Sequence, residues 1–167
     1  MRDAQPQDFE TLWRIDQNCF PPGIAYSRFE LAAYVGKRRA FTIVADTTAE
    51  PGGPAVSPSA TAVAGFIVAE SNRREEGHII TIDVLPSYRR SGLGSKLLLA
   101  AEERLRATPC QKVLLETAVD NSSAIAFYKR HDYHIARTIP RYYPDNVNAL
   151  VLQKELSPAA ERDRVAK

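Results

Sequence analysis

The stretch from Ile82 to Leu97 reads IDVLPSYRRSGLGSKL, and the interpretation of the whole chain starts from it. An apolar, β-branched run predicts a strand, a basic loop with two glycines follows, and a helical pattern begins at once. N–H groups at the start of a helix carry partial positive charge and favour an anion. Gly92 and Gly94 would let the main chain approach phosphate oxygens. Arg89 and Arg90 would add charge, so the stretch predicts a phosphate-binding loop.

Two common glycine motifs do not fit this loop. A Walker A loop has four residues between its first glycine and the Gly-Lys-Ser/Thr group, and the spacing here is different. A dinucleotide-binding fingerprint requires a third glycine at position 97, which is Leu97. On the glycines alone, a tight turn with a basic rim remains the alternative.

Strands and helices alternate around this loop, which predicts an α/β (α+β) fold. The chain of 167 residues suits a single domain, expected at 1–156 and followed by a charged tail at 157–167. A Pro-, Gly-, Ser- and Thr-rich loop is expected at 47–59. Ser27 and Glu30 form a capping box for the second helix, with Phe29, Leu31 and Ala33 as its apolar surface. Helices are expected at 8–19, from Ser27, at 92–106 and at 121–130, and strands at 40–45, 62–70, 77–84, 112–119, 133–139 and 147–156.

Composition narrows the possible partners and compartments. Lys and Arg number 22 against 20 Asp and Glu, a net charge of +2 that does not favour nucleic acid as a partner. No apolar run approaches the roughly 20 residues of a membrane helix, and the N-terminus lacks a secretory pattern. Cys19 and Cys110 are too few for a disulfide framework, so a cytoplasmic location is expected. His131 and His134 form no zinc motif with them, and we expect no metal. The oligomeric state stays open.

A second informative stretch, residues 115–128, reads LETAVDNSSAIAFY. Together, Arg89-x-x-Gly92-x-Gly94 and this stretch resemble the GNAT N-acetyltransferase superfamily. The similarity is greatest to the RimI-like ribosomal-protein and other protein N-terminal acetyltransferases, in which a strand Glu, a helix-opening Asn and a Tyr seven residues later have the spacing of Glu116, Asn121 and Tyr128. The resemblance implies one GNAT-type domain, a mixed central sheet of six to seven strands and about four helices.

The resemblance also implies where acetyl-CoA binds. The pyrophosphate loop corresponds to Arg89, Arg90, Ser91, Gly92, Leu93, Gly94 and Ser95. The main chain of a bulged strand end, matching Ile82, Asp83 and Val84, would contact the pantetheine arm and the thioester carbonyl. Asn121 would bind the pantetheine while capping its helix. Its alternative role is that of a cap alone.

The chemistry of acetyl transfer gives roles to two side chains. An amine must lose a proton before it attacks a thioester, and the resemblance assigns Glu116 as the base. The leaving thiolate needs a proton, which the resemblance assigns to Tyr128, while an N–H near Val84 would meet the oxyanion. The alternatives are a solvated carboxylate for Glu116 and a core aromatic for Tyr128.

On a regular strand, His78 would lie on the same face as Ile80, Ile82 and Val84. A catalytic tyrosine occupies the matching place in one eukaryotic lineage of the family, and His78 could act as a second base. The alternative is a solvent-facing strand histidine. One residue departs from the family pattern: Asp132 stands where a glycine is usual, and Asp tolerates a left-handed backbone.

The acceptor is expected to lie between the loop 20–26 and the turn 141–145, by resemblance. Tyr142 and Tyr143 resemble paired tyrosines that grip a peptide backbone, and Phe20 and Pro21 would form an apolar wall. A turn with amphipathic aromatics is the alternative. The leading hypothesis is therefore an acetyltransferase for a protein or peptide N-terminus. The alternatives are an enzyme for a small amine (an amino acid, polyamine or amino sugar) and a non-catalytic acyl-CoA sensor, and the acyl chain could be longer than acetyl.

Overall fold

The computed structural model describes residues 1–47, 62–72 and 74–156. The tail expected at 157–167, and all of the expected loop 47–59 except Thr47, lie outside the described residues. The elements agree with the expected ones to within a few residues, apart from an additional strand at the N-terminus. In chain order they are β1 (Arg2–Asp3), α1 (Phe9–Cys19), α2 (Arg28–Val35), β2 (Ala40–Thr47), β3 (Ala62–Ser71), β4 (Glu76–Val84), α3 (Leu93–Arg106), β5 (Lys112–Ala118), α4 (Ser122–Lys129), β6 (His134–Ile139) and β7 (Ala149–Glu155). Single 3-10 turns occupy Pro6–Asp8, Pro86–Tyr88 and Pro144–Asn146.

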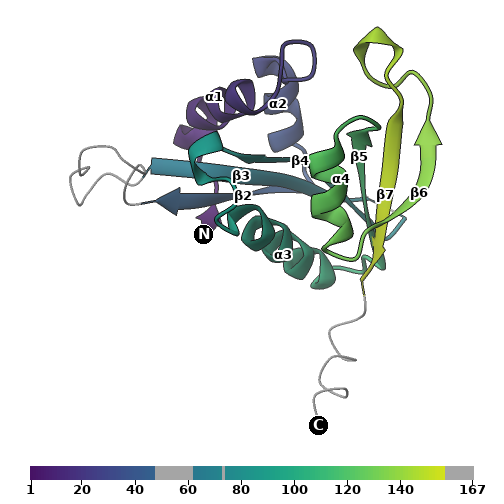
Figure 1. The fold of residues 1–167 in the computed structure, drawn as a ribbon. Coiled ribbons are helices and arrows are strands. Elements are labelled where there is room, and N and C mark those ends of the chain that lie inside the picture. Colours follow the sequence, from purple (N-terminus) through teal and green to yellow (C-terminus); the bar gives the residue numbers. More distant parts are fainter. Residues whose placement is uncertain (48–61, 73, 157–167) are drawn as a thin grey trace. The chain divides into compact units, whose positions relative to one another are not determined.

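The strands form one sheet in the order β1-β2-β3-β4-β5-β7-β6. β4 and β5 are parallel, whereas β5 with β7 and β6 with β7 are antiparallel, so β7 lies between β5 and β6 (Figure 1). Seven strands and four α-helices in the described residues confirm the expected mixed α/β architecture.

The described residues fall into two compact units. The first comprises the described residues within 1–69 and 81–101, and the second comprises those within 70–80 and 102–156. β3, β4 and α3 each contribute residues to both. We therefore describe each unit by itself.

In the first unit, α1 and α2 pack side by side (Figure 1). The Arg28 guanidinium lies 5.1 Å from the centre of the Trp13 ring. The capping box at Ser27 is confirmed, because its hydroxyl accepts the Glu30 N–H while Glu30 bonds back to the Ser27 N–H. One expectation for α2 is wrong. Phe29 is 83% exposed, because the helix turns it away from Leu31, which is completely buried.

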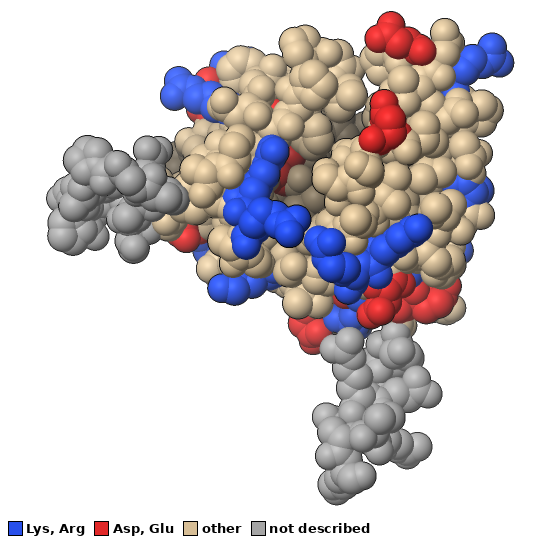
Figure 2. Space-filling model, viewed as in Figure 1, with Lys and Arg blue, Asp and Glu red and all other residues tan. Residues whose placement is uncertain are grey.

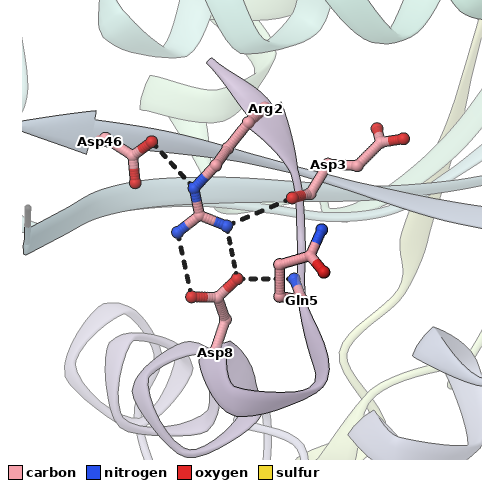
Figure 3. A network of polar contacts seen from close by, with 5 residues as sticks. All are labelled: Arg2, Asp3, Gln5, Asp8 and Asp46. Carbon is pink, nitrogen blue, oxygen red and sulfur yellow. Dashed lines mark hydrogen bonds and ion pairs between the residues drawn. The ribbon is translucent and has the colours of Figure 1, made fainter.

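An ion-pair network fixes the N-terminus to the first unit (Figure 3). The Arg2 guanidinium donates to both carboxylate oxygens of Asp8, at 2.7 and 3.0 Å, and its Nε donates to Asp46 on β2. Asp8 also accepts the Gln5 N–H. A bidentate pair of this kind combines charge with fixed geometry, and it explains why a two-residue strand forms beside β2.

The second unit is organised around β5, whose residues alternate between buried and half-buried positions. A Cβ on Gly77 would lie 2.7 Å from Leu105, so α3 packs directly on that face of β4. The buried carboxylate of Glu102 on α3 accepts hydrogen bonds from Arg106, Lys154 and the Tyr133 hydroxyl. The buried charge is thus neutralised and fully hydrogen-bonded.

On the face drawn in Figure 2, basic and acidic side chains are interspersed among a larger area of other residues, as the small net charge suggests. Among the described residues, no helix combines the length and apolar character needed to cross a membrane.

Candidate active site

The predicted phosphate-binding loop lies in the first unit, between β4 and α3. Gly92 has φ +83°, and its carbonyl accepts the Lys96 N–H that opens the helix. A Cβ on Gly92 would meet nothing within 4 Å, so the backbone angle, not crowding, requires glycine there. Arg90 also has a positive φ of 63°, which is uncommon for a long side chain. Strained residues of this kind gather at functional loops.

The residues of the loop that are predicted to bind phosphate include several that are exposed to solvent. Arg89, Arg90, Ser91 and Gly92 are exposed. Gly94 lies inside the first turn of α3, where the leading N–H groups have no carbonyl partner within the helix. The loop therefore has the features that an anion site requires: basic side chains, a helix N-terminus and a backbone held open by glycine.

β4 contains one more residue than β3 over the length along which the two strands pair. Two main-chain hydrogen bonds mark the ends of the β3–β4 pair. At the hairpin, the Asn72 N–H donates to the Glu76 carbonyl oxygen; at the opposite end of the pair, the Leu85 N–H donates to the Ala64 carbonyl oxygen. Between these contacts β4 advances nine residues (76 to 85) while β3 advances eight (72 to 64). One extra residue on one strand of an antiparallel pair is a β-bulge.

Gly65 marks the position of the bulge. A Cβ on Gly65 would lie 2.5 Å from the Asp83 carbonyl oxygen and 3.2 Å from Val84 Cα. The two strands approach so closely that no side chain fits. Gly65 was not predicted from the sequence, although a glycine inside a strand pattern is a known signal of a bulge or a close backbone approach.

The bulge carbonyl of Val84 accepts two hydrogen bonds within the first unit. Arg89 Nε donates at 3.0 Å and Cys19 Sγ at 3.4 Å. Burial, and then the charge of Asp83, raise the pKa of Cys19 to about 11, so the thiol remains protonated at neutral pH and can donate. Cys19 is thus a local hydrogen-bond donor, not a reactive thiolate.

Two buried carboxyl groups lie beneath the bulge. Asp83 and Asp16 are 1% and 0% exposed, and Asp83 Oδ2 and Asp16 Oδ1 have no hydrogen-bond partner among the described residues. Burial is the main cause that raises the pKa of Asp16 to about 6, and burial together with the charge of Asp16 raises that of Asp83. Because the Asp83 side chain is buried, Asp83 could meet a ligand only through its main chain. Ile82 and Val84 are half-buried on the opposite face.

The loop predicted to wall the acceptor follows α1. Phe20 ends the helix in an extended conformation, and Pro21 begins a turn in which its carbonyl oxygen accepts the Ile24 and Ala25 N–H groups. Phe20 is half-buried and Pro21 exposed. Asp16 holds the far end of this loop, because its carboxylate accepts the Tyr26 N–H at 2.8 Å.

In the second unit, His78 and Glu116 meet. Leu114 on β5 is the register partner of His78, and Glu116 stands two residues further on, so it shares the face of His78. His78 Nε2 and Glu116 Oε2 are 2.6 Å apart. The side chains are 34% and 19% exposed, so both remain reachable from solvent. The candidate bases of the sequence analysis thus form one hydrogen-bonded pair.

The other predicted residues of this unit lie on α4 and in the β6–β7 turn. Asn121 caps α4, and its Oδ1 accepts the Ala124 N–H at 3.1 Å. Tyr128 is 6% exposed, and its ring packs edge-on against that of Tyr133, with 5.5 Å between the ring centres. Tyr128 therefore packs in the core, the alternative role considered for it from the sequence. Asp132 has φ 66°, so the tolerance of Asp for the glycine position is confirmed.

Tyr142 and Tyr143 contact one another, with ring centres 5.0 Å apart. Tyr142 is 51% exposed, whereas Tyr143 is half-buried. Burial first, then the neighbouring Tyr142 and Glu116, raise the pKa of Tyr143 to about 12. The electrostatic link between Tyr143 and Glu116 shows that the turn and the predicted base belong to one neighbourhood.

Within the described ranges, no group of three His, Cys, Asp or Glu side chains is arranged to hold a metal ion. The first unit carries an anion loop and a bulged strand, and the second carries an acid–base pair, a capped helix and a tyrosine pair.

Comparisons with known proteins match this arrangement. A sequence profile of the acetyltransferase (GNAT) family matches residues 9–133. An N-alpha-acetyltransferase of Sulfurisphaera tokodaii is 26% identical over 93% of this chain and 92% of its own length. The solved structure of Ard1 from Thermoplasma volcanium has 28% identity and a TM-score of 0.75, covering 93% of this chain and 96% of that one.

Two further solved structures share the fold at lower identity. The ribosomal-protein-S18-alanine N-acetyltransferase of Escherichia coli has 22% identity and a TM-score of 0.74, with 95% of this chain and 94% of that chain covered. Arabidopsis thaliana NAA60, solved in complex with acetyl-CoA, has 19% identity and a TM-score of 0.76, with 93% and 97% covered. The profile match spans both the glycine loop and the Glu116–Tyr128 segment, and the chain belongs to the GNAT family of acetyltransferases.

Proposed function

We propose that this protein transfers the acetyl group of acetyl-CoA to the α-amino group of a protein or peptide N-terminus. The observation that carries the proposal is the 2.6 Å contact between Glu116 and His78 on adjacent strands, because it provides a partly exposed proton acceptor for an amine. The similarity to N-alpha-acetyltransferases supports a peptide acceptor.

In this proposal the first unit binds the nucleotide end of acetyl-CoA. The loop Arg89–Ser95 holds the pyrophosphate through N–H groups and the two arginines. The main chain of Ile82, Asp83 and Val84 hydrogen-bonds the pantetheine arm and the thioester carbonyl. Asn121, a residue of the second unit, contributes a side-chain amide. Arg89 would exchange its contact with the Val84 carbonyl for the phosphate.

The acid–base residues complete the reaction. Glu116, assisted by His78, accepts a proton from the substrate ammonium group, and the free amine attacks the thioester carbon. A main-chain N–H beside Val84 stabilises the oxyanion, and collapse of the intermediate breaks the C–S bond. Tyr128 donates a proton to the departing thiolate and regains one from the attacking nitrogen, which must lose a proton to become the amide. Phe20, Pro21, Tyr142 and Tyr143 bind the peptide.

The test is thiol release from acetyl-CoA against N-terminal peptides and small amines, with Glu116→Gln, Tyr128→Phe and the control Glu103→Gln. Glu103 is a suitable control because its side chain is 70% exposed and it lies on α3. Turnover on peptides that falls by roughly 100-fold or more in the first two variants, but not in the control, supports the proposal. Turnover on small amines alone would indicate the small-amine enzyme, and tight acetyl-CoA binding without any turnover would indicate a sensor.

A further inference from the structure

His78 is flanked by a second carboxylate. The β3–β4 hairpin is closed by the hydrogen bond from Asn72 to Glu76, so Glu70 and His78, two residues further along each strand, are cross-strand neighbours. Glu70 Oε1 lies 3.9 Å from His78 Nδ1. The two ring nitrogens of His78 therefore face carboxylates on different strands, Glu70 on β3 and Glu116 on β5.

The geometry constrains where the protons lie. A proton must occupy the 2.6 Å contact between His78 Nε2 and Glu116, because two lone pairs cannot face one another at that distance. A proton on Nδ1 as well would point toward Glu70 and give the ring a positive charge that two carboxylates balance. At 3.9 Å the contact with Glu70 is electrostatic, or is bridged by water.

We propose that Glu70 is a positioning residue of the proposed acetyltransferase: it orients the His78 ring with Nε2 toward Glu116 and stabilises the ring when both nitrogens are protonated. The inference rests on the proposed function, in which Glu116 receives the amine proton. Glu70 does not contact the substrate. It sets the pH range over which the His78–Glu116 pair can take up a proton.

Two further titratable groups lie near the His78–Glu116 pair. Glu76, two residues before His78 on β4, is paired with Lys112 of β5 at 2.9 Å. Tyr143, in the turn before β7, interacts electrostatically with Glu116 and remains neutral at physiological pH. Glu70 is therefore the group whose neutralisation changes the charge at Nδ1.

The experiment compares Glu70→Gln, Glu70→Asp and the control Glu103→Gln. α3, which carries Glu103, packs on the Gly77 side of β4, and neighbouring strand residues face opposite sides, so His78 is on the other face. The first readout is the pH profile of kcat/KM with a peptide. Loss of the Glu70 charge should move the acid limb to lower pH by roughly half to one unit, because a screened carboxylate at this distance contributes modestly. Glu70→Asp should restore part of the shift.

The second readout needs no activity. Long-range ¹H–¹⁵N spectra of ¹⁵N-histidine protein report ring protonation for each of the three histidines, with His78→Gln identifying the signal of His78. In Glu70→Gln the protonation midpoint of His78 should fall, while Glu103→Gln leaves it unchanged. An unchanged midpoint in Glu70→Gln would overturn the proposal.

The two readouts separate the possible failures. If the midpoint falls but the kinetic profile stays unchanged, Glu70 has no role in the reaction and the proposal is wrong. If wild-type protein turns over no amine, the proposed function fails, whereas the change in the His78 spectrum still reports whether Glu70 positions the ring.

Discussion

Replacing Gly65 with Ala tests the close approach of β3 to the bulge of β4. The new Cβ would stand 2.5 Å from the Asp83 carbonyl oxygen, and ordinary contact begins at 3.4 Å, so the strands would have to separate by about 0.9 Å. The neighbour is backbone within a sheet and cannot rotate away. Overpacking of this kind costs about 1–3 kcal/mol. The loss of chain entropy in the unfolded state offsets about 0.4–1 kcal/mol, so the net change is destabilising.

The measurement is denaturant unfolding of Gly65→Ala beside Gly92→Ala. We expect Gly65→Ala to lose about 1–2 kcal/mol, or roughly 2–8 °C in Tm, and to bind acetyl-CoA more weakly because the Asp83–Val84 main chain is displaced. Gly92→Ala meets open space, and its cost of about 1–2 kcal/mol comes only from the left-handed backbone. An unfolding free energy of Gly65→Ala equal to that of wild type would refute the close approach and, with it, the bulge.

Two further predictions concern buried carboxylates. Burial raises the pKa of Asp16 from its ordinary 3.8 to about 6, so the folded state binds the proton more tightly than the unfolded chain. Stability should therefore fall as pH rises from about 4 to about 6, by up to about 3 kcal/mol, and Asp16→Asn should flatten this part of the curve in unfolding at several pH values. Glu102→Ala should cost about 3–5 kcal/mol in the same assay, because it leaves the largely buried side chain of Lys154 without its carboxylate and leaves Arg106 with only the exposed Glu103 as an ion-pair partner. A loss below about 1 kcal/mol would show that these cations find other partners.

The sequence alone was sufficient for the order and type of the main elements. Apolar periodicity located the helices and strands, and local chemistry fixed their ends, as at the Ser27 capping box and the Asn121 cap. These signals are local, because a side chain bonds to backbone only three residues away. The same locality explains why Asp132 could be predicted to replace a glycine. The two-residue strand β1 was missed because its pairing depends on Arg2 reaching Asp8 and Asp46.

The prediction that Phe29 forms part of the buried apolar surface of α2 is wrong. An apolar residue on a short helix was expected to face the interior, but the helix turns its buried side toward Leu31 and leaves Phe29 exposed. In an eight-residue helix the apolar pattern is too short to define a face. No sequence pattern indicates that Asp16 and Asp83 are buried close enough to influence one another's pKa.

For the candidate site, the sequence determined which residues have the required chemistry, and the tertiary structure decided which of them meet. Resemblance to the family's motifs selected the glycine loop, Glu116, Asn121 and Tyr128, and it could do so because each motif lies within a single strand–helix segment. The contact of His78 with Glu116, and the approach of Glu70 to the same ring, required the parallel register of β4 with β5 and the register of the β3–β4 hairpin. Register is set by pairing across strands far apart in sequence, and shifting it by one residue turns a side chain to the other face of the sheet.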